Sequence, residues 1–183
     1  MTYVDRLETS RLVTRFLTQD DVTPWMEYCN DPIATMFTSF PHKKTASEMA
    51  QYWIDLSLKR YAEKRLGLQA LLDKETGAFI GQCGLLQQEV NDKTEIEVGY
   101  HLIRNFWGMG YATEAAKMFR DYGFENSAAE SLISIIHPLN ESSKKVALRN
   151  GMRLVETRAI FREKEYHLYR ITRTEWESIR PRG

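Results

Sequence analysis

The chain has 183 residues, of which 43% are hydrophobic and 27% are charged, and its 25 basic residues balance 25 acidic ones. A chain of this size can bury a core without metals or disulfides, and its balanced charge argues against bulk binding of nucleic acid or of an anionic membrane. No apolar run approaches the roughly 18 residues of a membrane span.

The cysteines and the chain start indicate a cellular compartment. Only Cys29 and Cys83 occur, and the N-terminal residues lack the charged and apolar regions of a signal peptide, so we expect a cytoplasmic protein. Paired CxxC spacing, HExxH and His/Cys clusters are missing from the sequence, so no metal site is expected.

The first half of the chain opens with a strand and two helices. Arg11–Leu17 is rich in β-branched and aromatic residues and predicts a strand, and the cap-like cluster Thr18–Asp21 follows it. A short helix through Trp25 and Tyr28 comes next. Thr45–Lys64 combines a capping residue with good helix formers and predicts the longest early helix.

Three strand-like segments come next. Gly67–Asp73 and Ala78–Val90 predict an antiparallel hairpin around Gly77, and Thr94–Ile103 has period-two alternation. On the last strand, one face is expected to carry Ile96, Val98, Tyr100 and Leu102, and the other Glu95, Glu97, Gly99 and His101.

The second half alternates helices and strands and ends in a hairpin. The predicted elements are a helix over Gly110–Glu125, a strand over Ser131–His137, a helix over Asn140–Asn150 that stops at Gly151, and a hairpin of Arg153–Phe161 and Tyr166–Thr172 with "REKE" at its tip. No repeat, low-complexity segment or linker interrupts the chain. One mixed α/β domain over residues 1–183 is therefore predicted.

The stretch "NFWGMGYATEA" places Gly108 and Gly110 between a strand and a helix. Backbone N–H groups at a helix start are unpaired and lie at the positive end of the helix dipole, so such a turn favours a phosphate. A P-loop would need Lys and Ser or Thr after the second glycine, and a dinucleotide fingerprint would need Gly or Ala where Thr113 stands. A tight turn without any ligand is the alternative.

A second group of residues, "HPLNESSKKVALRNGM", begins one strand later. Pro138 breaks the strand, and Asn140 and Ser143 fall on one face of the next helix's first turn. Taken alone, Asn140 is typical of an ordinary helix N-cap.

Together the two segments resemble the GNAT superfamily of acetyl-CoA-dependent N-acetyltransferases, in particular its ribosomal-protein N-terminal (Rim-type) branch. The likeness covers nearly the whole chain, and it is carried by "LETSRLVTRFLTQDD" (Leu7–Asp21), "IGQCGL" (Ile80–Leu85), "EVGYHLIRNFWGMGYATEA" (Glu97–Ala115), "NESSKKVALRNGM" (Asn140–Met152) and "YRITRTEW" (Tyr169–Trp176), the last as the closing strand. The resemblance implies a central, mostly antiparallel, twisted sheet of six to seven strands flanked by about four helices.

The chain departs from the family pattern at two positions. The pattern has Gln or Arg three residues before the first glycine, where this chain has Asn105 with Arg104 beside it. Met109 replaces a Lys or Arg that is common in this branch. Phosphate binding is therefore expected to fall to backbone N–H groups.

The resemblance implies acetyl-CoA as co-substrate, no metal, and direct transfer of the acetyl group without an acyl-enzyme. The backbone at Leu102 and Ile103 would pair with the pantetheine arm, and the glycine turn would take the pyrophosphate. The full set of expected coenzyme contacts is Leu102, Ile103, Asn105, Trp107, Gly108, Met109, Gly110, Tyr111, Ala112, Asn140 and Ser143.

Glu97 and His101 are the candidates for the general base because they share one face of the strand before the glycine turn. Glu97 is the preferred base, and Ser143 is the expected proton donor to the sulfur. The alternatives are an ordinary solvated or paired carboxylate at Glu97 and a structural role for His101.

The expected partner is an amine acceptor, with a protein N-terminal α-amine first and a polyamine, amino acid or aminoglycoside as the alternative. A non-catalytic acyl-CoA-binding module is a further alternative, and the resemblance leaves room for a homodimer. The early aromatic residues have the helical spacing that is typical of core residues. The segment His42–Lys44 is typical of a solvated loop. These aromatic residues are Trp25, Tyr28, Phe37, Phe40 and Trp53.

Overall fold

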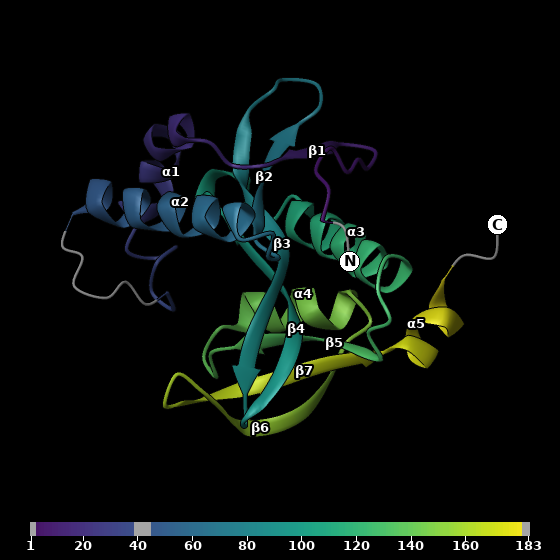
Figure 1. Cartoon of the computed structure of the whole chain (residues 1–183). Helices are drawn as coiled ribbons and strands as arrows, with labels where there is room; N and C mark the ends of the chain where they lie inside the picture. The colour runs from purple at the N-terminus through teal and green to yellow at the C-terminus, as the bar shows by residue number, and fades with distance from the viewer. Residues whose placement is uncertain (1–2, 39–44, 181–183) are drawn as a thin grey trace.

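A seven-stranded sheet in the order β1-β2-β3-β4-β5-β7-β6 forms the centre of the structure, a computed structural model that describes residues 3–38 and 45–180 (Figure 1). The strands are β1 (Leu12–Arg15), β2 (Leu68–Asp73), β3 (Phe79–Val90), β4 (Lys93–Leu102), β5 (Ser131–Ile136), β6 (Arg153–Phe161) and β7 (Lys164–Thr172). Only β4 and β5 pair in parallel; the other neighbours are antiparallel. The predicted mixed fold with a mostly antiparallel sheet is confirmed.

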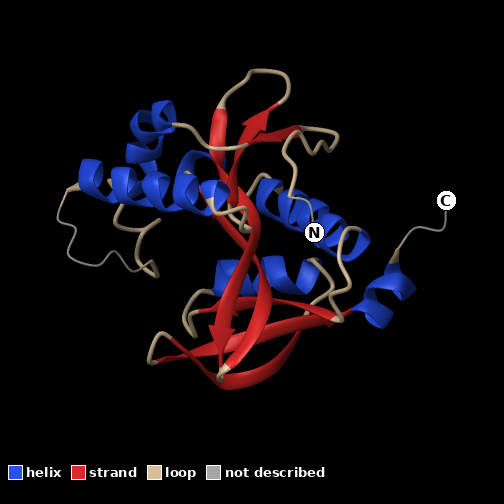
Figure 2. Cartoon of the chain, viewed as in Figure 1, coloured by secondary structure: helices blue, strands red, loops and turns tan. Residues whose placement is uncertain are grey.

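Helices flank the sheet on both faces, as Figure 2 shows. They are α1 (Val22–Cys29), α2 (Ala46–Ala62), α3 (Tyr111–Glu125), α4 (Glu141–Arg149) and α5 (Arg173–Ile179), with 3₁₀ turns η1 (Gln19–Asp21) and η2 (Arg104–Phe106). The long helix α2 begins where its sequence predicts, because Thr45 and Glu48 form a reciprocal capping box. Figure 1 shows α1 and α2 side by side, apart from α3 and α4.

The two faces of β4 meet different helices, as its alternation predicts. Val98 and Leu102 join the main core with residues of α3 and α4. On the opposite face, the ring of His101 lies edge-on to Tyr28 of α1 and Trp53 of α2. One short strand therefore separates two distinct environments.

The strands β4 and β5 separate soon after they meet. Their parallel pairing is registered at Glu97 and Ile133. Beyond it side chains bridge the gap: Ser134 Oγ donates to the Val98 carbonyl at 2.9 Å, and the Ile135 N–H donates to a Glu97 carboxylate oxygen at 3.4 Å. The sheet is thus opened along its middle by side chains that replace ladder hydrogen bonds.

The chain end differs from the prediction. The closing strand expected through Trp176 ends at Thr172, and Arg173 begins α5 instead. Thr172 and Glu175 form a capping box that starts this helix, and Trp176 stacks on Phe124 with ring centroids 5.0 Å apart. The strand over Arg173–Trp176 that the resemblance implied is therefore wrong, whereas the hairpin strand predicted to end at Thr172 is confirmed.

The hairpin before α5 has a tighter turn than "REKE". Arg162 and Glu163 alone form the tip, both with positive φ, because Lys164 already belongs to β7. Both cysteines are free and buried, as predicted for Cys83. Phe40 and His42–Lys44 lie outside the described residues.

Two further properties concern the described part of the chain. None of its helices is both long and apolar enough to cross a membrane. Within residues 3–38 and 45–180, no three His, Cys, Asp or Glu side chains gather as a metal-binding group.

Candidate active site

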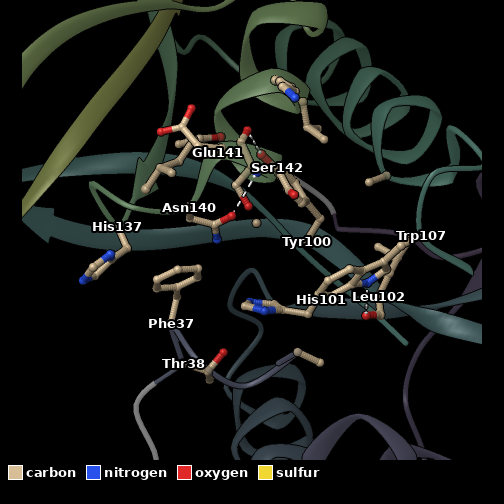
Figure 3. A pocket seen from close by; sticks show the side chains of 18 of the residues that line it. Phe37, Thr38, Tyr100, His101, Leu102, Trp107, His137, Asn140, Glu141 and Ser142 are labelled. Carbon is tan, nitrogen blue, oxygen red and sulfur yellow. Dashed lines mark hydrogen bonds between the residues drawn. The ribbon is translucent and has the colours of Figure 1, made fainter. Parts of the chain in front are cut away.

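The opening between β4 and β5 leads into a cavity of about 590 Å³ (Figure 3). Its lining includes most of the residues singled out in the sequence, although they belong to four separate elements. They are Glu97, His101 and Leu102 of β4, Trp107, Gly108 and Gly110 of the glycine turn, Tyr111 and Ala112 of α3, and Asn140 and Ser143 at α4. One continuous space therefore connects the glycine turn with the start of α4.

The glycine turn has the backbone that its sequence predicts. Gly108 and Gly110 have φ angles of 77° and 85°, which are left-handed values that disfavour other residues. A Cβ placed on Gly108 would meet no atom within 4 Å, so the backbone there is open to a ligand. Gly110 directly precedes α3, whose first N–H groups lack helical partners.

Arg11 fixes the outside of this turn, a role that the sequence did not suggest. Its guanidinium donates to the Met109 carbonyl at 3.0 Å and to the Glu114 carboxylate at 2.7 Å, and lies over the Tyr111 ring. Burial alone would raise the pKa of Glu114, but hydrogen bonds from Thr9 and Arg11 outweigh it and lower the pKa. Glu114, the acidic residue in the first turn of α3, is thus already paired with Arg11, which does not line the cavity.

Trp107 connects the glycine turn to the end of β4. Its indole Nε1 donates to the Leu102 carbonyl at 2.7 Å. The Ile103 N–H donates to Ile80 of β3, and neighbouring backbone groups alternate sides along a strand, so both backbone groups of Leu102 face away from β3. With its carbonyl occupied by Trp107, Leu102 presents its N–H as the polar group on that side.

Glu97 lies where β4 and β5 separate. One of its oxygens accepts from Gln88 Nε2 at 2.7 Å, and the other accepts from the Ile135 N–H. Removal from water raises the pKa of the carboxyl group, although both hydrogen bonds oppose this shift. A carboxylate with a raised pKa beside a cavity is suited to accepting a proton near neutral pH.

His101 is embedded among aromatic rings on the same strand face. Its Nδ1 lies 3.2 Å from the hydroxyl of Tyr28, and burial lowers its pKa to about 4. The imidazole is therefore neutral at physiological pH, and its Nδ1 is already engaged. The structural interpretation of His101 is the better supported one.

The start of α4 forms the opposite wall. Asn140 is the N-cap, and its side-chain oxygen accepts from the Ser143 N–H at 3.1 Å. The Tyr100 hydroxyl donates to the Ser143 carbonyl at 2.9 Å, which ties α4 to β4. Lys145 and Arg149 are exposed one turn apart and also line the cavity, and sequence reasoning missed them although their spacing of four places them on one helix face.

Three predicted coenzyme contacts do not line this cavity. Ile103 is buried in the core under α1 and α2, and the Asn105 side chain donates to Glu27 of α1 at 2.9 Å. The Met109 side chain is largely exposed. Any contact by these three residues would have to come from backbone atoms or from outside the cavity.

Aromatic residues far apart in the sequence close the remaining wall. Phe37, from the loop after α1, stacks on His137 at the end of β5 with centroids 4.7 Å apart, and His137 lies edge-on to Tyr166 of β7. Figure 3 shows the rings of His137, Phe37 and His101 along one side of the cavity. Phe37 was predicted as a core residue, and no signal in the sequence connects it with His137.

Known proteins are similar to this chain in sequence and fold. A family model described as an acetyltransferase (GNAT) domain matches residues 11–153, which is well over half of the chain. The chain belongs to the GNAT acetyltransferase family.

Relatives of this GNAT chain cover most of its length. It is 34% identical to the uncharacterized N-acetyltransferase p20 of Bacillus licheniformis over 78% of this chain and 79% of the relative. It is 27% identical to an acetyltransferase of Agrobacterium tumefaciens C58 whose crystal structure matches with a TM-score of 0.78, covering 93% of this chain and 96% of the other. The expected GNAT membership and N-acetyltransferase activity are confirmed.

A more distant structure shares only the fold. RimL, a ribosomal L7/L12 alpha-N-protein acetyltransferase solved with coenzyme A, matches with a TM-score of 0.69 and 13% identity over 90% of this GNAT chain and 95% of RimL. Enzymes of this family take the acetyl group from acetyl-CoA.

Proposed function

We propose that this acetyltransferase transfers the acetyl group of acetyl-CoA directly to a primary amine, with a protein N-terminal α-amine as the leading acceptor. The observation that carries the proposal is the single cavity that connects the open glycine turn, the Leu102 backbone and the start of α4. Neither cysteine is suited to compete with direct attack as a nucleophile, because burial raises the pKa of both Cys29 and Cys83.

The coenzyme fits the groups on the α3 and α4 side of the cavity. The N–H groups at Gly108, Gly110 and the start of α3 would hold the pyrophosphate, since a Cβ-free, open backbone allows close approach. Lys145 and Arg149 supply positive charge along the same wall for the remaining phosphate. Asn140 and the Leu102 backbone would hold the pantetheine arm.

The Leu102 N–H is placed to polarise the acetyl carbonyl. The Leu102 carbonyl already accepts a hydrogen bond from Trp107, so the end of the strand offers the Leu102 N–H as a free donor beside an acceptor that is already paired. A donor aimed at an oxygen that gains negative charge is worth roughly 10²–10³ in rate in other acyl-transfer enzymes.

Glu97 takes the proton that the acceptor amine loses, directly or through one water. The Ser143 hydroxyl gives a proton to the departing sulfur as the C–N bond forms and the C–S bond breaks. Glu97 and Ser143 both line the cavity, Glu97 from β4 and Ser143 from α4. Proton transfer at both ends thus needs no further group.

The first experiment is calorimetric titration with acetyl-CoA, with NADH as the control, followed by an amine screen that detects the free thiol of the product. We expect saturable micromolar binding of acetyl-CoA alone and thiol release with at least one primary amine. Binding without turnover by any amine would favour the non-catalytic acyl-CoA-binding module. Absence of binding would overturn the assignment of the glycine turn.

A further inference from the structure

The cavity has two halves, because the two faces of β4 meet different helices. Tyr100 and Leu102 belong to the face that packs on α3 and α4, where the proposed coenzyme groups lie. Glu97 and His101 belong to the face toward α1 and α2. If the coenzyme occupies the first half, as the proposed function requires, the acceptor must approach through the second, here called the acceptor half.

The acceptor half carries a single acidic group among the described residues. Glu97 and Glu141 are the carboxylates of the described lining, and Glu141 belongs to α4, where it pairs with Lys144 at 2.6 Å. Asp31 precedes the rim residue Ile33 by two positions. Its carboxylate forms an ion pair with Arg104 at 2.6 Å and accepts hydrogen bonds from the N–H groups of Ile33 and Ala34.

The rest of the described acceptor half is mostly aromatic and apolar, and its Thr38 hydroxyl is already paired with the Tyr28 hydroxyl at 2.9 Å. Phe37, Tyr28 and Tyr166 line it, and the neutral ring of His101 closes its floor. At the rim, Met36 and Ile33 are 63% and 47% exposed, although both are large apolar side chains. Exposed apolar side chains gathered at the mouth of a cavity are typical of a surface that a ligand covers.

A polyamine or an aminoglycoside carries several positive charges, and each would need an acidic partner when it loses water. Glu97 can serve one amine, and the described residues that line the acceptor half offer no second carboxylate. An N-terminal residue with an apolar side chain needs one acid for its amine and an apolar wall for its side chain. Charge and burial both fit this second class of acceptor.

We propose that the acceptor of this enzyme is a polypeptide N-terminus whose first residue has an uncharged, apolar side chain, held by Phe37, Met36 and Tyr166 while Glu97 receives the amine proton. This inference rests on the proposed acetyl transfer to an amine and narrows its substrate class. It excludes polycations as preferred acceptors.

The test compares acceptors that differ in one feature, with thiol release from acetyl-CoA as the readout. Tetrapeptides with the sequence X-Gly-Ser-Gly, in which X is Leu, Phe, Lys or Asp, are compared with spermidine. We expect kcat/KM for the Leu and Phe peptides to exceed that for the Lys peptide and spermidine by about tenfold or more, the usual discrimination of an apolar pocket.

Variants at the rim separate recognition from catalysis. Met36→Ser is expected to lower kcat/KM for the Leu peptide about fivefold, with the KM for acetyl-CoA unchanged, because an exposed side chain can be removed without unfolding the protein. Met36→Glu should reduce the preference for Leu over Lys, since it adds the missing acid. Ile160→Ser, on an exposed position of β6 away from the cavity lining, is the matched control and should change neither value.

The outcomes distinguish the two levels of the proposal. Equal use of the Leu and Lys peptides, or spermidine as the best acceptor, would overturn the inference and leave amine acetylation intact. Preference for the Leu peptide that Met36→Ser does not reduce would overturn the assignment of this surface. Acetyl-CoA binding with no acetylation of any of the five acceptors would overturn the proposed function and the inference with it.

Discussion

Glu97 combines partial burial with two hydrogen bonds at the point where β4 and β5 separate. Its pKa is raised, and a base must be deprotonated to accept a proton. Activity should therefore fall as the pH drops through a value above the ordinary glutamate pKa of about 4.3. The acidic limb of the rate profile would report this carboxyl group.

The corresponding variant is Glu97→Gln, which keeps the size and a hydrogen-bonding amide but cannot take the proton. We expect kcat to drop by about 10²–10⁴, the usual contribution of a positioned base, and the acidic limb to disappear. Calorimetry should give an unchanged Kd for acetyl-CoA. An unchanged kcat across the pH range would remove Glu97 as the base.

Trp107 is a positioning residue, since its indole N–H bonds to the strand carbonyl. Trp107→Phe keeps an aromatic ring and deletes only this donor. We expect kcat to fall about five- to tenfold, a loss of roughly 1–1.5 kcal/mol, because the freed Leu102 carbonyl oxygen would then repel the acetyl oxygen that the Leu102 N–H is proposed to bind. The melting temperature should change little, as the side chain is 40% exposed. If Trp107→Phe kept the kcat of the parent protein, the proposed positioning role of Trp107 would be wrong.

The glycine turn can be tested as an element because the chain provides an internal control. Gly108 and Gly77 both have positive φ, 77° and 71°, and a Cβ on either would meet no atom within 4 Å. Valine at either position should therefore cost a similar amount of stability, roughly 1–2 kcal/mol. Only Gly108→Val is expected to weaken acetyl-CoA binding, by about tenfold, since Gly77 lies in the β2–β3 turn.

Calorimetry and thermal melts of the two variants measure both effects. Equal Kd values for Gly108→Val, Gly77→Val and the parent would contradict the assignment of the pyrophosphate to this turn. Gly110→Val serves as a second test, with the added contact that its Cβ would lie 3.4 Å from the Arg11 guanidinium.

Elements with a local signal could be predicted from the sequence, and contacts between distant elements could not. The alternation in β4 correctly predicts that the side chains of Glu97 and Val98 lie on different faces of the strand. The spacing of Gly108 and Gly110 correctly predicts left-handed backbone. The Thr172–Glu175 capping box was overlooked, although its signal is local. The Arg11 contacts and the Phe37–His137 stack depend on tertiary packing alone, so no pattern in the sequence reveals them.

The complete sheet consists of two parts, β1–β4 and β5–β7, whose direct link at the opening is short. A ligand lying between them would contact both parts and stabilise the folded state. At acetyl-CoA a hundredfold above its Kd, we expect about 2.7 kcal/mol of added stability, measured by chemical denaturation. NADH should add none, and slower amide hydrogen exchange should appear in β4 and β5 together. Protection of one strand only would contradict a bridging position.

The separation of β4 from β5 also decides where the protein can bend. One registered pair, Glu97 with Ile133, joins the two parts at this point, and the hydrogen bond from the Ser134 hydroxyl to the Val98 carbonyl lies directly beyond it, so this joint is where a hinge would form. Moving the two parts away from each other here would break few hydrogen bonds, because the long β3–β4 and β5–β7 ladders each lie within one part. Because the proposed base sits on the hinge itself, each opening that releases a product would also expose Glu97 to water and let it discharge its proton before the next cycle.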